Sequence, residues 1–149
     1  MRTKDRLYLE ADYACALCGQ RNRHFLTEHH IDGNKRNNAY ENRILICYNC
    51  HQSHHDRRGA KRADIKERKR LLILKTITPH GLAAMKQAKR GTTGVLAIPF
   101  LLHHLVDLRY MKQGHVPMSY GDNPALAAFE ITAKGSKVLE QIECGDNTR

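Results

Sequence analysis

Residues 47–55 have the sequence CYNCHQSHH, in which two cysteines and three histidines fall within nine positions. The segment CALCGQ, residues 15–20, carries a second Cys-x-x-Cys pair, and 28 residues separate the two pairs. Two thiolates on one turn can face the same ion, and a second such turn completes a set of four ligands. The spacing therefore predicts a tetrahedral zinc site formed by Cys15, Cys18, Cys47 and Cys50.

Two other uses of paired cysteines fit this sequence less well. A disulfide framework would require a secreted protein, yet the opening residues MRTKDRLYLEAD lack the apolar stretch of a signal peptide. A redox motif would use one Cys-x-x-Cys pair and leave the other without a purpose. Cys144 stands alone near the C-terminus, and we expect it to be a free thiol without a role.

The composition indicates a basic protein whose charge is concentrated in one segment. The 149 residues carry 25 Lys and Arg against 15 Asp and Glu, a formal net charge of +10. Residues 57–90 alone hold 12 basic and two acidic side chains, so most of these cations lack an acidic partner in sequence. This imbalance favours a polyanionic partner such as nucleic acid. A merely solvated helix face is the alternative interpretation.

No segment is apolar over the roughly 20 residues that a membrane-spanning helix needs. The longest apolar run, residues 95–102, is interrupted by Pro99. With no signal peptide either, we expect a cytoplasmic protein without a membrane partner.

The histidines fall on segments with recognisable secondary-structure patterns. Residues 26–31 are predicted to form a short strand, residues 44–46 a second strand, and residues 50–56 a helix. Neighbouring side chains of a strand point to opposite faces. His29 and His30 can therefore serve different purposes, one holding a metal ion and the other facing a substrate.

The predicted helix adds two further histidines on one face. His51 and His55 are four residues apart, which places both imidazoles where they can bind one ion. His54 is expected to point elsewhere.

The order of these residues resembles the HNH nuclease family, whose core is a ββα-metal fold. The resemblance is carried by CALCGQ, EHHIDGN and ENRILICYNCHQSHH, and it covers roughly residues 12–57. In that family a His-His or Asp-His dipeptide lies on the first strand, an Asn follows in the loop, and Cys-x-x-Cys-His-x-x-x-His begins the helix. The resemblance implies an α+β protein: a ββα-metal core with structural zinc knuckles, followed by a mostly helical C-terminal part.

The resemblance also implies roles for individual residues. His30 matches the general base, and Asn42 matches the central Asn that hydrogen-bonds across the loop and holds the base in place. The ligands of the catalytic divalent ion match His29, His51 and His55. That ion is expected to be Mg²⁺ or Mn²⁺ during turnover, although three imidazoles also suit Zn²⁺ or Ni²⁺. In a shifted strand register, Glu28 would compete as a ligand.

The implied function is that of a metal-dependent HNH endonuclease that hydrolyses DNA phosphodiester bonds. The ion stabilises the charge of the transition state, and His30 takes a proton from the attacking water. Small stand-alone members occur among phage and homing endonucleases, so a phage or bacterial host cytosol is the expected setting. Two alternatives stay open: a non-catalytic zinc-binding protein that binds nucleic acid, which needs only the four cysteines, and an HNH-type RNase.

The chain is expected to divide into three parts: residues 1–57 as the nuclease core, 58–90 as a basic helical segment, and 91–149 as a helical accessory domain. Within the basic segment, Pro79 is expected to end the first helix, and a second short helix is expected to follow. The segment PALAAFEITAKGSKVLEQIE resembles the end of a winged-helix domain, and a small helical domain of no particular type is the alternative. His103 and His104 are expected to be surface or partly buried residues and not ligands. The expected contacts to the DNA backbone are Arg57, Arg58, Lys61, Arg62, Lys66, Arg68, Lys69 and Arg70.

Overall fold

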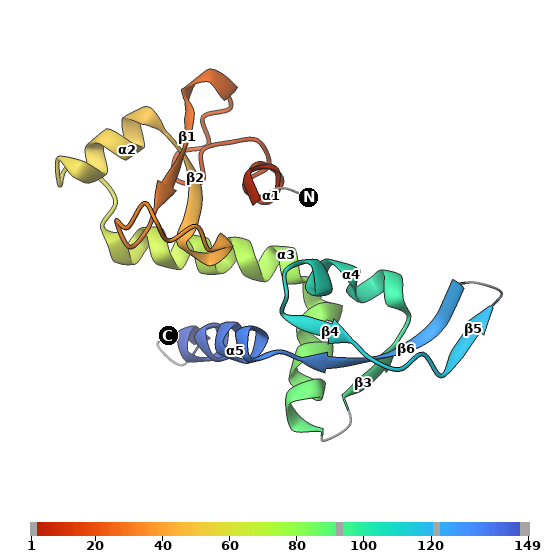
Figure 1. The fold of residues 1–149 in the computed structure, drawn as a ribbon. Helices are drawn as coiled ribbons and strands as arrows, with labels where there is room; N and C mark the ends of the chain where they lie inside the picture. Colours follow the sequence, from red (N-terminus) through yellow and green to blue (C-terminus); the bar gives the residue numbers. More distant parts are fainter. Residues whose placement is uncertain (1–2, 92–93, 121–122, 147–149) are drawn as a thin grey trace. The chain divides into compact units, whose positions relative to one another are not determined.

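The computed structural model describes residues 3–91, 94–120 and 123–146. It has an α+β fold and divides into two compact units, Met1–Thr76 and Ile77–Arg149. The boundary lies inside the predicted basic segment, because helix α3 (Arg62–Arg90) is interrupted at Thr78, where φ is 67° and ψ is 156° (Figure 1). Proline disfavours the helical conformation in the residue before it, so the prediction that a helix ends at Pro79 is confirmed.

Unit 1 is built on a two-stranded antiparallel sheet. Its strands pair with Leu26 opposite Cys47 and His30 opposite Arg43. Figure 1 shows that α2 follows β2 directly and lies beside the hairpin. The elements of this unit, besides the part of α3 up to Thr76, are α1 (Thr3–Glu10), η1 (Arg23–Phe25), β1 (Leu26–His30), η2 (Tyr40–Asn42), β2 (Arg43–Cys47) and α2 (Tyr48–His55).

The core of unit 1 is centred on β2. Ile44, Leu45 and Ile46 are consecutive and all have no exposed surface, so the strand is covered on both faces. A continuous apolar run, without the alternation of a half-exposed strand, is the sequence pattern of such a strand. Leu7 from α1 and Ile65 from α3 are likewise fully buried.

A buried ion pair joins α1 to α3. The Nζ atom of Lys69 lies 2.6 Å from Oε1 of Glu10, and the two side chains are 2% and 1% exposed. The hydroxyl of Tyr40 donates to the second carboxylate oxygen of Glu10, and Lys69 Nζ lies 3.7 Å from the centroid of the Tyr40 ring. Burial raises the pKa of Glu10 and lowers the pKa of Lys69 to about 8. The expected contact between Lys69 and the DNA backbone is therefore corrected, because this ammonium group is enclosed in the core.

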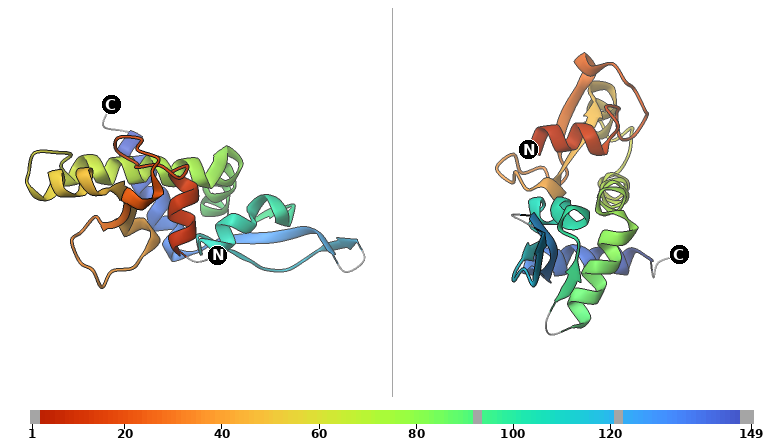
Figure 2. Two further views of the ribbon diagram at one scale, coloured as in Figure 1. Left: turned by 90° about the horizontal axis from the view of Figure 1, so that it is seen from above. Right: turned by 90° about the vertical axis from the view of Figure 1, so that its right-hand side faces the viewer.

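Unit 2 combines helices with an antiparallel sheet, so it is not helical alone. Strand β6 lies between β3 and β4 and also pairs with β5. Figures 1 and 2 show β5 and β6 continuing as a two-stranded ribbon beyond α4. After the second part of α3, the elements are β3 (Val95–Ala97), α4 (Pro99–Asp107), β4 (Met111–Gln113), β5 (Met118–Tyr120), β6 (Asn123–Ile131) and α5 (Ala133–Asp146).

The end of unit 2 has the predicted order of strand, threonine and helix. Oγ1 of Thr132 accepts a hydrogen bond from N of Gly135 at 3.0 Å and donates one to O of Arg109 at 2.7 Å. A Cβ on Gly135 would lie 2.0 Å from O of Tyr110, so only glycine fits there. This order of elements matches the segment that carries the winged-helix resemblance, and the resemblance beyond that segment stays a prediction.

The adjacent histidines of α4 have separate surroundings. His103 is exposed, and Nε2 of His104 lies 2.9 Å from O of Ile77. Their exposed and partly buried positions agree with the expectation from the sequence. None of the helices in the described part of the chain is both long and apolar enough to cross a bilayer.

Candidate metal centres and nucleic-acid interface

Four cysteines from two separate segments meet in unit 1. Cys15 and Cys18 lie in the turns after α1, Cys47 ends β2, and Cys50 lies in the first turn of α2. Their sulfur atoms all lie within 4.8 Å of one another, and Sγ of Cys18 is 3.6 Å from Sγ of Cys47. A tetrahedral zinc ion with Zn–S distances of about 2.3 Å spaces its ligands roughly 3.8 Å apart. The predicted cysteines thus form a cluster that can hold a structural metal such as zinc.

Backbone hydrogen bonds position the first cysteine pair against the sheet. N of Gly19, which has a φ of 79°, donates to O of Cys15 at 2.9 Å and closes the turn. N of Ala16 donates to O of Leu45 at 2.9 Å and attaches this turn to β2. The glycine at the end of CALCG therefore supplies the left-handed residue that this turn requires.

The thiols of Cys15 and Cys50 differ in how readily they ionise. Burial opposes ionisation of Cys15, but hydrogen bonds from the backbone of Cys18, Cys47 and Leu17 outweigh it and lower its pKa to about 7. Burial and the neighbouring thiols raise the pKa of Cys50. Metal binding requires thiolates, so a bound ion would release protons from this cluster.

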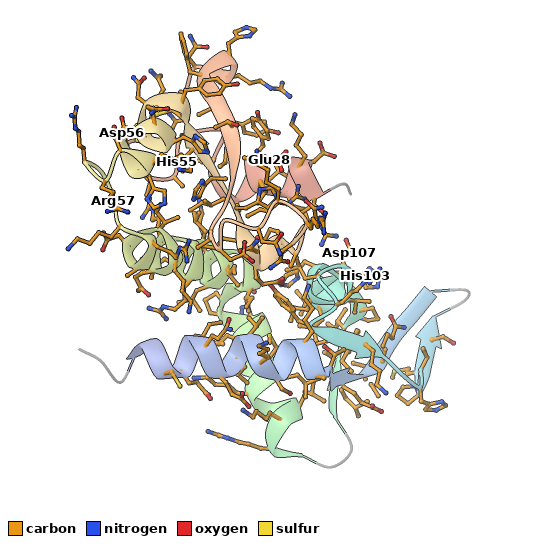
Figure 3. The ribbon with its side chains drawn as sticks, turned by 60° about the vertical axis from the view of Figure 1, so that its left-hand side comes forward. Glu28, His55, Asp56, Arg57, His103 and Asp107 are labelled. Carbon is orange, nitrogen blue, oxygen red and sulfur yellow. The ribbon has the colours of Figure 1, made fainter. Side chains whose placement is uncertain are left out.

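Three histidines form a second cluster, from β1 and α2. The nitrogen atoms of His29, His51 and His55 lie within 4.8 Å of one another, and the two Nε2 atoms of His51 and His55 are 3.4 Å apart. A tetrahedral ion with Zn–N distances of 2.0–2.1 Å spaces its ligands roughly 3.3 Å apart. The residues expected to bind the catalytic ion are therefore brought together. Figure 3 shows His55 at the end of α2, with Asp56 and Arg57 in the turn beyond it.

Of the three histidines in this cluster, His29 has the features most typical of a metal ligand. The residue is 5% exposed, and its buried Nε2 has no hydrogen-bond partner in the structure. A buried polar atom without a partner costs free energy unless a ligand occupies it. Burial, followed by the charges that neighbouring imidazoles would carry, lowers the pKa of His29 to about 4. The ring is therefore neutral at pH 7, with a lone pair available to a cation.

His54 lies beside the histidine cluster, contrary to the expectation that it would point elsewhere. Its ring packs edge-on against that of His29, with 5.1 Å between the centroids. Its Nδ1 lies 2.7 Å from O of Ala60, and this contact holds the turn after α2 against the helix. Neighbouring residues of a helix differ in direction by about 100°, and the prediction that His54 points away from the cluster followed from this difference. The angle does not prevent a long side chain from bending back toward its neighbours.

His30 lies on the opposite face of β1 from His29. Its Nε2 is 3.3 Å from Oδ1 of Asn38. Asn42 spans the loop between the strands: its Oδ1 accepts from N of Asp32 at 3.0 Å, and its Nδ2 donates to Oδ1 of Asp32 and to O of Asn37, both at 2.9 Å. The amide that contacts His30 is thus that of Asn38, which sequence reasoning missed. The several asparagines of this loop are the sequence feature that could have indicated such a contact.

Glu28 is engaged in an ion pair and does not join the histidine cluster. Its Oε2 lies 2.7 Å from Nη1 of Arg43, the residue directly opposite His30 on β2. Glu28 and His29 point to opposite faces of β1 because they are adjacent on a strand. The metal-ligand group therefore contains the histidine and not the carboxylate.

The basic residues expected at the nucleic acid have unequal surroundings. Nε of Arg68 donates to O of Ala16 at 2.7 Å, and Nε of Arg70 lies 2.8 Å from Oε2 of Glu67. These two guanidinium groups are partly committed to contacts within unit 1. Arg68 is exposed all the same, and the other exposed basic residues in the turn after α2 and the first turns of α3 are Arg57, Arg58, Lys61, Arg62 and Lys66.

Comparison of the chain with known protein families, with curated proteins and with solved structures finds no match.

Proposed function

We propose that this protein is a metal-dependent HNH-type endonuclease that hydrolyses DNA phosphodiester bonds. The observation that supports the proposal most is the histidine cluster. Nε2 of His29 is buried without a hydrogen-bond partner, and His29 belongs to one group of possible metal ligands with His51 and His55. A protein that only binds zinc for structure needs the four cysteines and no second ligand group. The adjacent His30, on the other face of β1, adds a proton acceptor.

The donor set helps to choose the metal. Imidazoles suit Zn²⁺ and Ni²⁺, whereas Mg²⁺ prefers oxygen ligands and retains water. When bound at His29, His51 and His55, a divalent ion would act as a Lewis acid toward a phosphate oxygen. Zn²⁺ and Ni²⁺ are therefore better candidates than Mg²⁺ for this set.

The residues near the ion would accept the proton of the attacking water and hold the base in position. Oδ1 of Asn38 can only accept a hydrogen bond, so the contact places a proton on Nε2 of His30 and leaves Nδ1 with its lone pair. That nitrogen can take a proton from the attacking water. Asn42 ties the two ends of the loop together and thereby supports the position of His30.

Cleavage of supercoiled plasmid tests the proposal. Purified protein should nick or linearise the plasmid with Mn²⁺, Ni²⁺, Zn²⁺ or Mg²⁺ supplied singly, and EDTA should stop the reaction. The variant His30→Ala should lose about 10²-fold to 10⁴-fold in rate, the usual contribution of a general base. The zinc content of this variant should equal that of wild type, because the substitution leaves the four cysteines unchanged. His103→Ala, an exposed histidine in unit 2, is the matched control.

The alternatives predict other outcomes of the same assay. A wild-type protein that binds duplex DNA and cleaves neither DNA nor RNA would support a non-catalytic binding protein. Cleavage of RNA alone would support an RNase built on the same site. Near wild-type cleavage by His30→Ala would contradict the assignment of the base.

A further inference from the structure

A cavity of about 540 Å³ lies in unit 1 beside the cysteine cluster. This volume falls within the range of cavities that bind small molecules. A zinc ion among the sulfur atoms would fill only a small part of it, because Zn–S distances are about 2.3 Å. The cavity therefore has room for a further and larger ligand. Besides three of the four cysteines, the residues that line it include Gln20, Phe25, Asn49, Ser53, Arg58 and Gly59.

The wall formed by the turn after α2 is held in place by hydrogen bonds. N of Arg58 and N of Gly59 both donate to O of Ser53 at 2.9 Å. Nδ1 of His54 lies 2.7 Å from O of Ala60, the next residue of this wall. A Cβ on Gly59 would lie 2.9 Å from Cβ of Ser53, so this close approach requires glycine. The cavity is therefore shaped before a ligand arrives, which lowers the entropic cost of binding.

Phe25 gives the cavity an aromatic surface. It is the last residue of η1, directly before β1, and 52% of its surface is exposed. A half-exposed aromatic ring on a cavity wall can stack on a flat ligand. Every nucleobase has such a flat face, so stacking of this kind accepts any base.

The polar groups of the cavity can pair with the edge of a nucleobase. The amide of Asn49 is exposed and can both donate and accept a hydrogen bond, the pattern with which amides bind adenine. Oε1 of Gln20 accepts from N of Asn22 at 3.1 Å, which leaves its Nε2 as a donor. The described residues that line the cavity include the guanidinium group of Arg58 and no carboxylate. This charge favours a ligand that is attached to phosphates.

The cavity and the histidine cluster lie on opposite sides of α2. Asn49 and Ser53 are four residues apart and share one face of the helix. His51 and His55 share another face, which is two residues further along and therefore about 200° around the axis. A helix with its side chains is about 10–12 Å across. A strand that reaches both sides must therefore extend over several nucleotides.

We infer that this cavity, here called the base pocket, holds one unpaired nucleobase of the DNA strand, with Phe25 stacked on its ring and Asn49 hydrogen-bonded to its edge. The inference rests on the proposed function and deepens it, because it names a binding site for the substrate away from the cut. Given the width of α2, the base belongs to a nucleotide roughly two to four positions from the scissile phosphate. A base in a duplex must leave its pair to enter such a pocket, so an unpaired strand should bind more readily.

The test measures binding of the zinc-loaded full chain to two single strands of DNA, without any other divalent ion. The two strands have the same length and number of phosphates, but one is abasic at every position except its ends. Fluorescence anisotropy should show that wild type binds the complete strand about five-fold to a hundred-fold more tightly. Phe25→Ala should reduce this ratio nearly to one and leave the affinity for the abasic strand unchanged. Phe25→Tyr should keep the ratio, because it keeps the ring.

Matched controls separate the base pocket from other contacts. Tyr13→Ala removes an aromatic ring of unit 1 that is 50% exposed and lies outside the cavity lining, so it should keep the ratio. Asn49→Ala should lower the ratio about two-fold to ten-fold, the usual effect of one hydrogen bond. Gln52→Ala removes an exposed amide of α2 outside the lining and should keep the ratio. Phosphate contacts cancel in every ratio, because both strands carry the same phosphates.

The outcomes for the base pocket and for the proposed function are separate. Equal affinity of wild type for the two strands, or an unchanged ratio in both Phe25→Ala and Asn49→Ala, refutes the base pocket, and plasmid cleavage by wild type would still support the endonuclease. A ratio that depends on Phe25 in a protein that cleaves no plasmid would keep the pocket and refute the endonuclease. Zinc content checks the fold of each variant. Should Phe25→Ala lose zinc, Asn49→Ala decides, because its side chain is exposed.

Discussion

His29 links the stability of unit 1 to pH. Its pKa is about 4 in the folded protein without a bound ion and about 6.5 in an unfolded chain. Between these values the unfolded chain binds more protons, so the free energy of unfolding rises with pH from 4 to 6.5 and is level above that. Acidification from pH 6.5 to pH 4 should therefore lower the free energy of unfolding by up to about 3 kcal/mol.

Denaturant unfolding of wild type and His29→Gln, without added divalent ions, measures this effect. The difference in unfolding free energy between them should grow from pH 5 to pH 6.5 and then stay constant. Loss of zinc from the cysteines in acid affects both proteins and cancels in the difference. Parallel pH profiles would contradict the buried, neutral state of His29.

Lys69 and Glu10 form the second residue-scale test. Lys69→Met leaves the carboxylate of Glu10 buried without its partner and should destabilise the protein by about 3–5 kcal/mol. The double variant Glu10→Gln/Lys69→Met should recover most of the loss, since no charge is then buried. Urea denaturation measures both. Lys66→Met, on the exposed side of α3, is the control and should change stability by about 0.5 kcal/mol or less. A mild effect of Lys69→Met would contradict the enclosed ion pair.

At the scale of elements, α2 contributes residues to both candidate metal centres from one short helix. Its first turn contributes Cys50, and the histidines His51 and His55 follow within the same eight residues. The first cysteine pair is attached to β2 through Ala16, and β2 carries Cys47 into the helix. Loss of metal from the cysteine cluster should therefore also disturb the histidine cluster, whereas the reverse is not required.

The basic segment divides into cations that are engaged in contacts within unit 1, Arg68 and Arg70, and further exposed cations, which gives a prediction on salt dependence. Arg57, Arg58 and Lys61 are exposed in the turn after α2 and at the start of α3. Replacing all three by Ala should flatten the slope of log K against log salt for duplex DNA by up to about 2.7, since each phosphate contact contributes about 0.9. The paired replacement Arg68→Ala/Arg70→Ala should change that slope less, because contacts within unit 1 engage both. Fluorescence anisotropy at several salt concentrations measures these slopes, and equal slopes for all variants would contradict this division.

At the scale of the whole molecule, the chain consists of two compact units, and both metal-ligand groups of the described residues lie in the first. Metal binding contributes directly to folding free energy when the ligands are not assembled in the unfolded chain. Calorimetry should therefore resolve two transitions, of which a strong zinc chelator lowers only one. Cys15→Ser should lower the same transition without chelator. A single transition that shifts as a whole would mean that the units unfold together.

Local sequence patterns made several features of the fold and of the candidate site predictable. The Cys-x-x-Cys spacing depends on residues within one turn, and the His51 and His55 spacing on one helical face, so both could be recognised without tertiary information. Pro79 likewise acts on its immediate neighbour. Lys69 was misjudged because charge was counted along the chain. Its position four residues after Ile65 and four before Ile73 places it on the buried stripe of α3.

The residues that could bind metal, the strands and helix that carry them, and the location of the positive charge could all be predicted before the fold was known. These properties depend on residue type and on short-range periodicity. The folded arrangement was needed to show that Lys69 is enclosed by Glu10 and Tyr40, that Asn38 rather than Asn42 contacts His30, and that His54 packs against His29. Each of these contacts joins segments whose approach is determined by the packing of apolar faces, and no local pattern encodes which polar side chains that packing brings together.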